Sequence, residues 1–538
     1  MDRYDYIVVG GGSAGCVTTS RLVREFGARV LLLESGPPDR HRLIDMPAGF
    51  VKFLLRPSPF MSVYQSPPQP SLDGRSLTLM QAHVLGGGSS VNAMTYTRGV
   101  PADYAKWDAA TGGAGWNWAA LLPYFRKHEG NQRLNTAAHG IDGPLKVSDP
   151  HHPLCDASRV FLHAMQDLGV AYATDVNSGD QQGVAIVQTT THKGRRCSAA
   201  RAFLDPVRAD PRLTLKCNAE VIRIVLDNGR AAGVEFVRRG GRGIERAYAD
   251  HEVVLTAGTY VTPKLLMLSG IGPAAHLADI GIQTRVDLPG VGQNMQDHNC
   301  AFLIASANSA CGYFGEDRGL RMLANGLQYL CFGSGPVASN ASEVMAFVRT
   351  TEAATAEPDL QIYCMPVMTP TPLLSPPPAH GITLMANLIT PQSRGSVRLR
   401  SADPADQPII DPNYLADARD LRTLVAGMRY ARAIVETAPM RRLIRDVLGP
   451  DPRIKSDAEL AAYCKAVTGT NYHPVGSCRM GLDSDPYAVL TPNLEVRGVA
   501  GLRVFDASMM PNIVSANTNA PVMAVADRAV DLMMKGGA

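Results

Sequence analysis

The stretch YHPVGSCRMG, residues 472–481, contains a histidine in a setting that suits proton transfer. His473 stands directly before a proline, in a glycine-rich and polar segment near the end of the chain. A neutral imidazole has an ordinary pKa of about 6.5, so it can accept a proton near neutral pH. Such a general base typically contributes about 10²–10⁴ in rate. Whether His473 does this depends on what the rest of the chain places beside it.

A second stretch, at the N-terminus, has the spacing of a dinucleotide site. The apolar run Tyr6–Val9 leads into Gly10-x-Gly12-x-x-Gly15, a helical pattern follows, and the apolar strand ARVLLLESG ends at Glu34. Gly10 permits the tight turn, Gly12 lets the backbone approach a pyrophosphate, and Gly15 lets helix and strand pack closely. The helix N-terminus offers free N–H groups to phosphates.

Glu34 narrows the choice of nucleotide without settling it. It follows the glycines by about 20 residues, where a carboxylate can accept hydrogen bonds from ribose hydroxyls. An acidic residue at this position disfavours a 2′-phosphate, and therefore NADP. It does not separate NAD from FAD.

The composition is that of a large globular protein, with 538 residues, 45% hydrophobic, 19% charged and a net charge of +3. No long basic run or aromatic platform points to nucleic acid. No run approaches the roughly 18 apolar residues of a membrane span, which leaves peripheral association open. Ten cysteines at irregular spacings form no C-x-x-C pair, so we expect no metal site and a reducing, cytoplasmic setting.

Further motifs make the nucleotide assignment specific. The chain resembles the glucose–methanol–choline (GMC) oxidoreductase family, and within it the bacterial FAD-dependent alcohol and choline-dehydrogenase-like members. Beside the N-terminal fingerprint, the resemblance rests on five ordered motifs: LGGGSSVNAM, TPKLLMLSGIGP, LPGVGQNMQDH, HPVGSCRMG and DASMMPNIVSANTNAPVMAVADRAVDLM.

The resemblance implies an α/β fold, α+β overall, with a Rossmann-like FAD domain interleaved with a substrate domain on an antiparallel sheet. Residues 1–150, 190–300 and 465–538 are expected to form the FAD-binding domain. Residues 151–189 and 301–464 are expected to form the substrate-binding and cap domain. The proline-rich segment 364–381 is expected to be a long irregular loop, either a lid or an uninvolved surface loop.

The family's chemistry gives His473 a role. Alcohol oxidation removes a hydroxyl proton and a hydride from the neighbouring carbon, and flavin N5 accepts the hydride. His473 matches the family's catalytic histidine, and Asn517 matches the second catalytic position, where it can hold the substrate oxygen. We expect the other histidines to be structural, except that His298 in QDHN is a candidate neighbour of the site.

The resemblance also implies which residues hold FAD. The N-terminus of the last helix, expected over residues 520–534, faces the flavin and stabilises negative charge on it. Val91 stands where some relatives attach FAD through a histidine, so the FAD is expected to be non-covalent. The expected FAD-binding residues are Gly10, Gly12, Ser13, Ala14, Gly15, Glu34, Gly86, Gly87, Ser90, Val91, Asn92, Ala93, Met94, Val221, Asp506, Ala507, Asn517, Thr518 and Pro521.

The substrate and the electron acceptor are less defined. Asn340 and Glu343 lie in a segment that approaches the flavin in relatives, and Glu343 is either a substrate ligand or a structural carboxylate. We expect a primary alcohol as substrate and a quinone-like acceptor. The alternatives are an alcohol oxidase that uses oxygen, a hydroxynitrile lyase with structural FAD, an NAD-dependent enzyme, which the C-terminal motifs disfavour, and a non-catalytic flavin-binding module.

Overall fold

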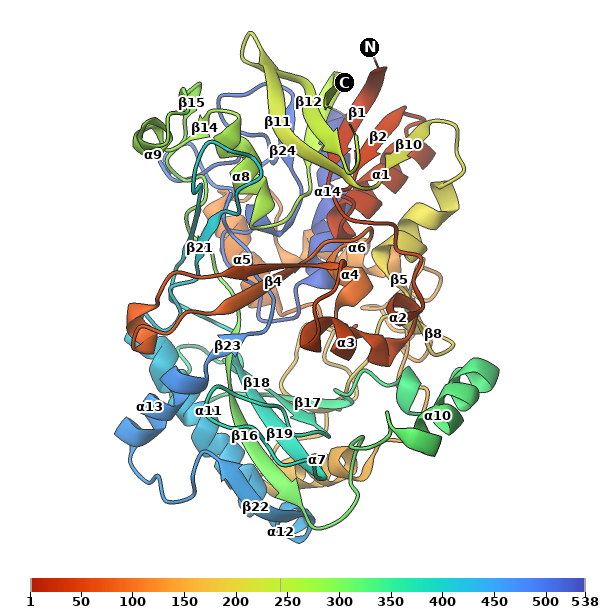
Figure 1. The fold of residues 1–538 in the computed structure, drawn as a ribbon, viewed down its shortest axis with the longest axis vertical. Coiled ribbons are helices and arrows are strands. Elements are labelled where there is room, and N and C mark those ends of the chain that lie inside the picture. The colour runs from red at the N-terminus through yellow and green to blue at the C-terminus, as the bar shows by residue number, and fades with distance from the viewer. Residues whose placement is uncertain (1, 242, 537–538) are drawn as a thin grey trace.

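Two large sheets organise the computed structural model, which describes residues 2–241 and 243–536 (Figure 1). The first sheet lies in the upper half of the view and the second in the lower half. Each sheet is surrounded by its own large set of buried apolar side chains. The predicted fold class, a mostly parallel sheet combined with an antiparallel sheet and helices, is confirmed.

The first sheet has seven strands in the order β10-β2-β1-β13-β12-β11, with β24 also pairing with β13. The strands β10, β2, β1, β13 and β24 run parallel, while β12 and β11 add an antiparallel extension. β2 is fully buried, as expected for a strand covered on both faces. The bounds are β1 (Asp2–Val9), β2 (Val30–Leu33), β10 (Leu213–Lys216), β11 (Ala219–Asp227), β12 (Arg230–Arg238), β13 (Ile244–Leu255) and β24 (Leu502–Val504).

The second sheet is antiparallel throughout. Its order is β22-β16-β19-β18-β17-β7, with β23 pairing with β16. The bounds are β7 (Gly183–Ile186), β16 (Asn299–Ala307), β17 (Val344–Val348), β18 (Leu360–Met365), β19 (Gly381–Leu388), β22 (Ile444–Gly449) and β23 (Gly469–Thr470).

Helices cover both sheets. α1 packs beside α14, so the first and last helices of the chain lie together (Figure 1), and α6 also packs on α14. α11 packs on β16 and β19 of the second sheet, and α7 packs on β17 and β18. The bounds are α1 (Ser13–Arg24), α5 (Pro101–Ala110), α6 (Trp118–His128), α7 (Asp156–Asp167), α8 (Val261–Leu268), α10 (Gly319–Phe332), α11 (Ala418–Glu436), α12 (Ala438–Leu443), α13 (Asp457–Val467) and α14 (Asn519–Gly536).

Shorter elements connect these layers. They are α2 (Arg42–Asp45), α3 (Phe50–Leu55), α4 (Gly88–Val91), α9 (Ala274–Asp279), the strands β3 (Met61–Gln65), β4 (Thr78–Ala82), β5 (Glu129–Asn131), β6 (Leu145–Val147), β8 (Thr191–His192), β9 (Arg195–Arg196), β14 (Ile271–Gly272), β15 (Val286–Asp287), β20 (Ser396–Arg398) and β21 (Ile409–Asp411), and short 3₁₀ or π turns.

Two sequence expectations need correction at their ends. The last helix begins at Asn519, one residue earlier than expected, and continues to Gly536. The proline-rich segment is irregular only over residues 366–380, because Cys364 and Met365 pair with β19 as the end of β18. In both cases backbone hydrogen bonds, and not the local composition, determine the residue at which the element begins or ends.

Most of the ten cysteines are buried, as expected for small apolar side chains, and all ten are free thiols. Cys331 on α10 is the exposed exception. Among the described residues, no helix is both long enough and apolar enough to cross a bilayer.

Candidate active site

The backbone around His473 is fixed on both sides. The His473 N–H donates to Asp297 Oδ1 at 2.8 Å, and the carbonyl of the following Pro474 accepts from Thr259 Oγ1 at 2.7 Å. Gly476 has φ +89°, and a Cβ there would lie 2.7 Å from the Asn294 carbonyl. The HPVG sequence therefore makes a turn that only glycine completes without strain.

The side chain of His473 meets Asn517, so the structure brings the two expected catalytic residues together. His473 Nε2 lies 3.2 Å from Asn517 Nδ2. The orientation of this amide is fixed, because Oδ1 accepts hydrogen bonds from Thr97 Oγ1 at 3.0 Å and Tyr363 OH at 3.1 Å. The amide therefore presents its N–H group to His473, and Nε2 carries the accepting lone pair.

The other side of the ring meets His298. The two Nδ1 atoms are 3.0 Å apart, and the ring planes are perpendicular. Since Nε2 of His473 accepts, its ring proton sits on Nδ1 and is donated to His298. His298 is fully buried, and it holds His473 in the tautomer that leaves Nε2 free to take a proton.

Both rings are neutral at pH 7. Burial lowers the pKa of His473 to about 4, although part of its side chain is accessible. Burial lowers the pKa of His298 well below its ordinary value, and the charge of a protonated His473 lowers it further. Two neighbouring imidazolium ions would repel each other in this enclosed site, so the neutral pair is the stable state.

The buried carboxylate of Asp297 holds the backbone next to the two histidines. Asp297 accepts hydrogen bonds from Thr470 Oγ1 at 2.6 Å and from Tyr414 OH, in addition to the N–H of His473. Burial raises the pKa of Asp297 to about 6, and these hydrogen bonds limit the rise. Its contacts to the 470–473 segment and to Tyr414 hold the backbone of His473 in place.

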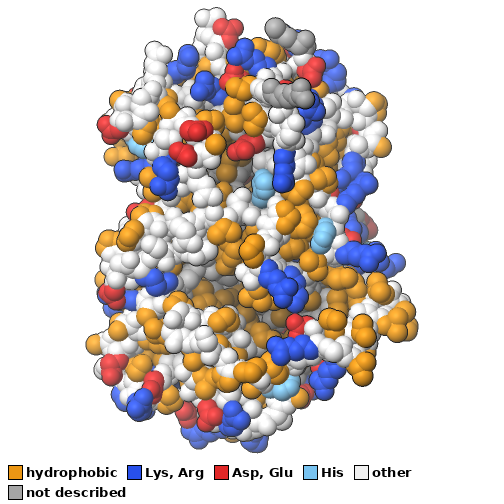
Figure 2. Space-filling view, viewed as in Figure 1, with side chains coloured by type: hydrophobic (Ala, Val, Ile, Leu, Met, Phe, Trp, Pro, Cys, Tyr) orange, Lys and Arg blue, Asp and Glu red, His pale blue; other side chains and the backbone are white. Residues whose placement is uncertain are grey.

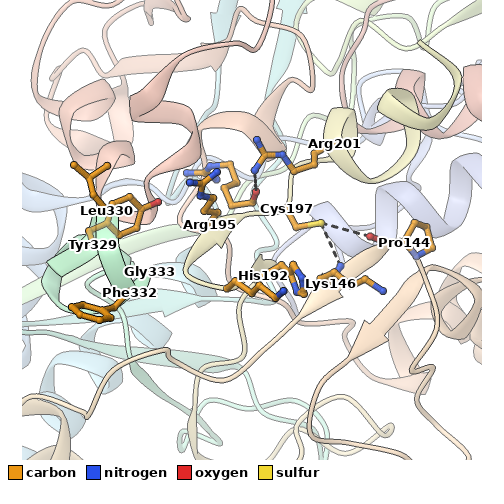
Figure 3. A pocket seen from close by; sticks show the side chains of 12 residues that line it. Pro144, Lys146, His192, Arg195, Cys197, Arg201, Tyr329, Leu330, Phe332 and Gly333 are labelled. Carbon is orange, nitrogen blue, oxygen red and sulfur yellow. Dashed lines mark hydrogen bonds between the residues drawn. The ribbon is translucent and has the colours of Figure 1, made fainter. Parts of the chain in front are cut away.

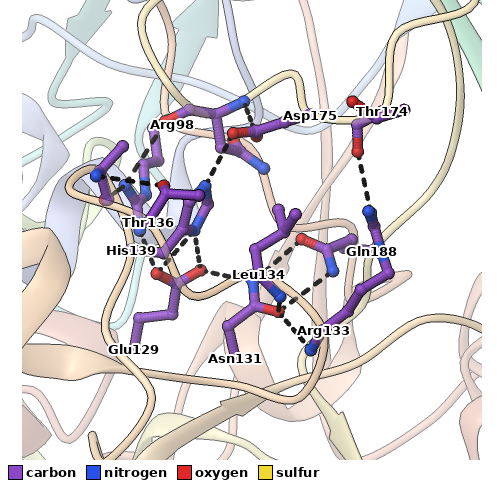
Figure 4. Close-up of polar contacts among 12 residues, drawn as sticks. Arg98, Glu129, Asn131, Arg133, Leu134, Thr136, His139, Thr174, Asp175 and Gln188 are labelled. Carbon is purple, nitrogen blue, oxygen red and sulfur yellow. Dashed lines mark hydrogen bonds and ion pairs between the residues drawn. The ribbon is translucent and has the colours of Figure 1, made fainter.

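Thr97 orients the Asn517 amide, and the next residue in the chain, Arg98, belongs to a buried network of ion pairs (Figure 4). The Arg98 guanidinium pairs with Glu129, and Glu129 also accepts from His139 Nδ1 at 2.9 Å. His139 Nε2 meets Asp175 Oδ2 at 3.0 Å. Burial disfavours the charged imidazole, yet hydrogen bonds to Asp175 and Glu129 outweigh this and raise the pKa of His139. The network fixes the chain directly beside Thr97.

The N-terminal glycines form a tight loop with one open face. Gly10 has φ +102°, and a Cβ on Gly15 would lie 2.0 Å from the Gly10 carbonyl oxygen, so both positions require glycine. A Cβ on Gly12 would meet nothing closer than 3.8 Å, so this face of the loop is open to a ligand. The helix α1 has no side-chain cap, and its first N–H groups are available to phosphates.

Glu34 lies against the same loop. Its Oε2 accepts from Gly11 N at 2.7 Å and its Oε1 from Gly36 N at 2.7 Å, and the side chain is buried. The backbone N–H of Ala219 donates to the Glu34 carbonyl, which brings the start of β11 to this edge. Val221 lies two residues further along β11, so the predicted adenine-binding backbone begins beside the predicted ribose-binding acid.

The second glycine segment touches the first. Gly86 N donates to the Gly11 carbonyl at 2.7 Å, and a Cβ on Gly87 would lie 2.7 Å from the Cα atom of Gly12. Ser90 Oγ donates to the Leu85 carbonyl, and Val91 is buried at the end of α4. This close approach explains the two consecutive positive-φ glycines.

Two side chains from other parts of the chain hold the rest of this segment, residues 92–94. Asn92 Oδ1 accepts from Arg196 Nη1 at 2.7 Å and from the backbone N–H of Met94. The Ala93 carbonyl accepts from Asn340 Nδ2 at 2.8 Å, which brings one of the two expected substrate residues to the expected flavin segment.

Glu343, the second expected substrate residue, has a different set of partners. Its carboxylate accepts from the Cys155 N–H at 3.0 Å and from Tyr313 OH, and it lies 3.5 Å from His152 Nδ1. None of these partners is His473 or Asn517. The side chain is 1% exposed, and through the Cys155 N–H it contacts the N-terminal end of α7.

The C-terminal motif joins the N-terminal glycine loop to the His473–Asn517 pair. Ser13 Oγ donates to Asn519 Oδ1 at 2.8 Å, and the backbone N–H of Val522 donates to the Thr518 carbonyl in the first turn of α14, where Pro521 also lies. Asp506 Oδ2 accepts from Gly258 N at 2.9 Å and from a threonine of α8, residue 262.

The same motif is also linked to the turn that follows His473. The Ala507 carbonyl accepts from Gly476 N at 3.1 Å. Hydrogen bonds therefore connect the fingerprint, the start of α14, the HPVG turn and the 506–507 segment. A buried glycine cradle with uncapped N–H groups, next to a neutral imidazole, fits FAD.

Sequence reasoning missed several members of this site. No spacing in the sequence marks Thr97, Tyr363 or Tyr414, because they come from separate strands and loops. The fourth missed residue is Asp297. Asp297 alone had a local signal, since it directly precedes His298 in the motif that includes both.

Comparisons with known proteins agree with this geometry. Two GMC oxidoreductase family profiles match residues 4–300 and 391–526. The chain is 39% identical to an alcohol dehydrogenase [acceptor] from Pseudomonas putida, over 99% of this chain and 96% of that protein. It is 38% identical to the mitochondrial choline dehydrogenase of Homo sapiens, over 99% and 90% of the two chains.

Solved structures give the same result. The crystal structure of pyridoxine 4-oxidase from Mesorbium loti has a TM-score of 0.88 and 30% identity, covering 98% of both chains. A fungal aryl-alcohol oxidase has a TM-score of 0.87 and 25% identity, covering 100% of both chains. The chain therefore belongs to the GMC oxidoreductase family and is an FAD-dependent oxidoreductase that acts on CH–OH groups.

Proposed function

We propose that the protein oxidises a primary alcohol to the aldehyde and passes the electrons to a quinone-like acceptor. The observation that carries this proposal is the pair of His473 Nε2 and Asn517 Nδ2, 3.2 Å apart. One atom accepts a proton and the other donates a hydrogen bond, so together they can bracket a single hydroxyl oxygen.

The protein residues then divide the work. The neutral His473 takes the hydroxyl proton on Nε2, and its Nδ1–H remains donated to His298. Asn517 donates to the substrate oxygen and keeps the carbinol carbon oriented, while Thr97 and Tyr363 hold the amide. FAD, when bound, supplies the hydride acceptor.

The FAD-binding residues are proposed on the contacts described above. Gly10, Gly12, Ser13, Ala14 and Gly15 would hold the phosphates, with Glu34 on the ribose and Val221 beside the adenine. The remaining contacts would come from Gly86, Gly87, Ser90, Val91, Asn92, Ala93, Met94, Asp506, Ala507, Asn517, Thr518 and Pro521.

The FAD is proposed to be non-covalent. Val91 packs among Ile44, Phe53, Phe60 and Val84 and carries no nucleophile. Acid precipitation should leave yellow FAD in the supernatant. Flavin that stays with the denatured chain would contradict this part of the proposal.

The division into domains is also a proposal, supported by the sheets. Residues 1–150, 190–300 and 465–538 would form the FAD domain, which contains every strand of the first sheet. Residues 151–189 and 301–464 would form the substrate domain, although β23 and the start of β16 reach into the second sheet. The ten free thiols support a cytoplasmic location.

One anaerobic experiment tests the function. The holoenzyme is mixed with a panel of primary alcohols, and the flavin absorption is followed. Bleaching by an alcohol supports the proposal, and recovery with a quinone but not with oxygen supports the acceptor. Recovery with oxygen would identify an oxidase instead. Release of cyanide from a cyanohydrin without bleaching would identify a lyase.

A further inference from the structure

The helix α10 carries its apolar side chains on the outside. Leu320, Leu323, Leu327 and Leu330 recur at i, i+3, i+7 and i+10, a spacing that places them along one face of a helix. Their side chains are 84%, 65%, 64% and 71% exposed. In an ordinary surface helix such a stripe faces the core, whereas α10 leaves it exposed.

The opposite side of the helix holds it to the protein. Tyr329 is the single residue of α10 that is buried, and its hydroxyl contacts the Asp45 carbonyl at 3.4 Å. Phe332 and Met322 add further exposed apolar surface, 79% and 50%. Figure 2 shows hydrophobic side chains gathered at the right edge of the molecule, where α10 lies in Figure 1. Contiguous apolar surface of this kind marks an interaction site.

A cationic groove borders the apolar face (Figure 3). Leu330 and Phe332 of the helix line one side of a hollow of about 500 Å³, and the β8–β9 hairpin lines the other. Lys193 and Arg195 are exposed on that hairpin, and among the described residues neither has a carboxylate within 4 Å. Lys146 also lines the groove.

Other charges nearby are already balanced or buried. Arg201 pairs with Asp45, and Arg196 is buried against backbone carbonyls. At the start of the helix, Arg318 and Arg321 face the two acidic residues 317 and 316. The unbalanced charge beside the apolar face is therefore positive.

We propose that α10 and this groove form a docking surface for a bilayer that contains anionic lipids. An exposed apolar helix face with flanking Lys and Arg side chains inserts about 5–10 Å into the headgroup region, while the cations contact lipid phosphates. In a symmetric pairing of two copies, residue i of one copy meets residue j of the other, so Lys193 and Arg195 would need free carboxylates opposite them, whereas lipid phosphates can meet both cations directly. This surface is separate from His473 and Asn517, and it does not rest on the proposed function.

The test is vesicle flotation of the holoenzyme, with phosphatidylcholine vesicles that contain or lack phosphatidylglycerol. We expect binding to the anionic vesicles, weakened by salt. Leu323→Glu/Leu327→Glu should lower binding by on the order of tenfold or more, because the apolar face no longer inserts. Lys193→Ser/Arg195→Ser should lower it by roughly fivefold for each cation removed.

Ile244→Glu is the matched control. Ile244 is 60% exposed at the start of β13, on the first sheet, and this variant should bind as the wild type does. The FAD content and the thermal midpoint of each variant show whether it has folded. If the double glutamate variant loses FAD, Leu327→Ser replaces it.

A probe on the helix gives a second readout without a substitution. Cys331 is the exposed cysteine, and it lies on the same face as Leu320 and Leu327. An environment-sensitive dye on Cys331 should shift to shorter wavelength when anionic vesicles are added. Wild-type protein that does not bind anionic vesicles would overturn the proposal. A dimer in gel filtration that the Leu323→Glu/Leu327→Glu variant dissociates would also overturn it, since a second copy would then cover this face.

Discussion

The side-chain amide nitrogen of Asn517 lies 3.2 Å from Nε2 of His473. The amide cannot rotate freely, because Thr97 and Tyr363 both hold its oxygen. The contact therefore fixes the tautomer of the histidine and marks the place where a hydroxyl oxygen would sit.

Asn517→Ala should slow the reduction of the flavin by the alcohol, but less than loss of the base does. The amide only positions the oxygen, and a hydrogen bond of this kind contributes about 0.5–1.5 kcal/mol. The effects of Asn517→Ala and His473→Ala should not add, since both side chains act on the same oxygen. Stopped-flow measurements on both single variants and the double variant check this. Fully additive effects would show that the two residues act independently.

Asp297→Asn should remove a pH dependence of stability. The folded pKa, about 6, lies above the unfolded value of about 3.9. The folded state therefore holds the proton more tightly, and this stabilisation is full below about pH 4 and lost as the pH rises to about 6.

The measurement is chemical denaturation of wild type and Asp297→Asn at several pH values. The free energy of unfolding of the wild type, relative to the variant, should fall by up to about 3 kcal/mol between about pH 4 and pH 7. A difference that stays constant over this range would mean that Asp297 titrates alike in the folded and unfolded states.

Glu34→Ala should weaken FAD binding by roughly 10- to 150-fold, since ribose hydroxyls would lose a charged acceptor and Gly11 N its partner. Titration of the apoprotein with FAD measures this. Glu34→Gln, which keeps one acceptor oxygen, should lose less. Unchanged affinity in Glu34→Ala would place the ribose elsewhere.

Glu129→Gln should destabilise the fold by about 3–5 kcal/mol, because Arg98 loses the charge of its buried partner. Glu436→Gln is the matched control, since Glu436 pairs with Arg441 at an exposed site and its loss should change stability little. The measurement is the thermal unfolding midpoint of each variant relative to the wild type. Equal midpoints would show that the buried network adds no more than a surface pair.

The local motifs predicted much of this structure because they impose local geometry. The glycine fingerprint required a strand, a tight turn and a helix, and β1, Gly10 and α1 are these elements.

The remaining site residues are joined only by the fold. Tyr363 on β18 and Thr97 after α4 meet at the Asn517 amide, although more than 100 residues separate each pair. No periodicity encodes such a contact. The exposed apolar face of α10 was missed for another reason, since an apolar stripe in a sequence does not say whether it faces the core or the outside.

The central claim is that His473 takes the proton of the alcohol. His473→Ala should fold and bind FAD, while the rate of flavin reduction falls by about 10²–10⁴, equivalent to roughly 3–5 kcal/mol. The measurement is anaerobic stopped-flow reduction at saturating alcohol, with His163→Ala as a control, since the side chain of His163 is exposed on α7. A His473→Ala enzyme with full FAD content that reduces its flavin within a few-fold of the wild-type rate would contradict the claim.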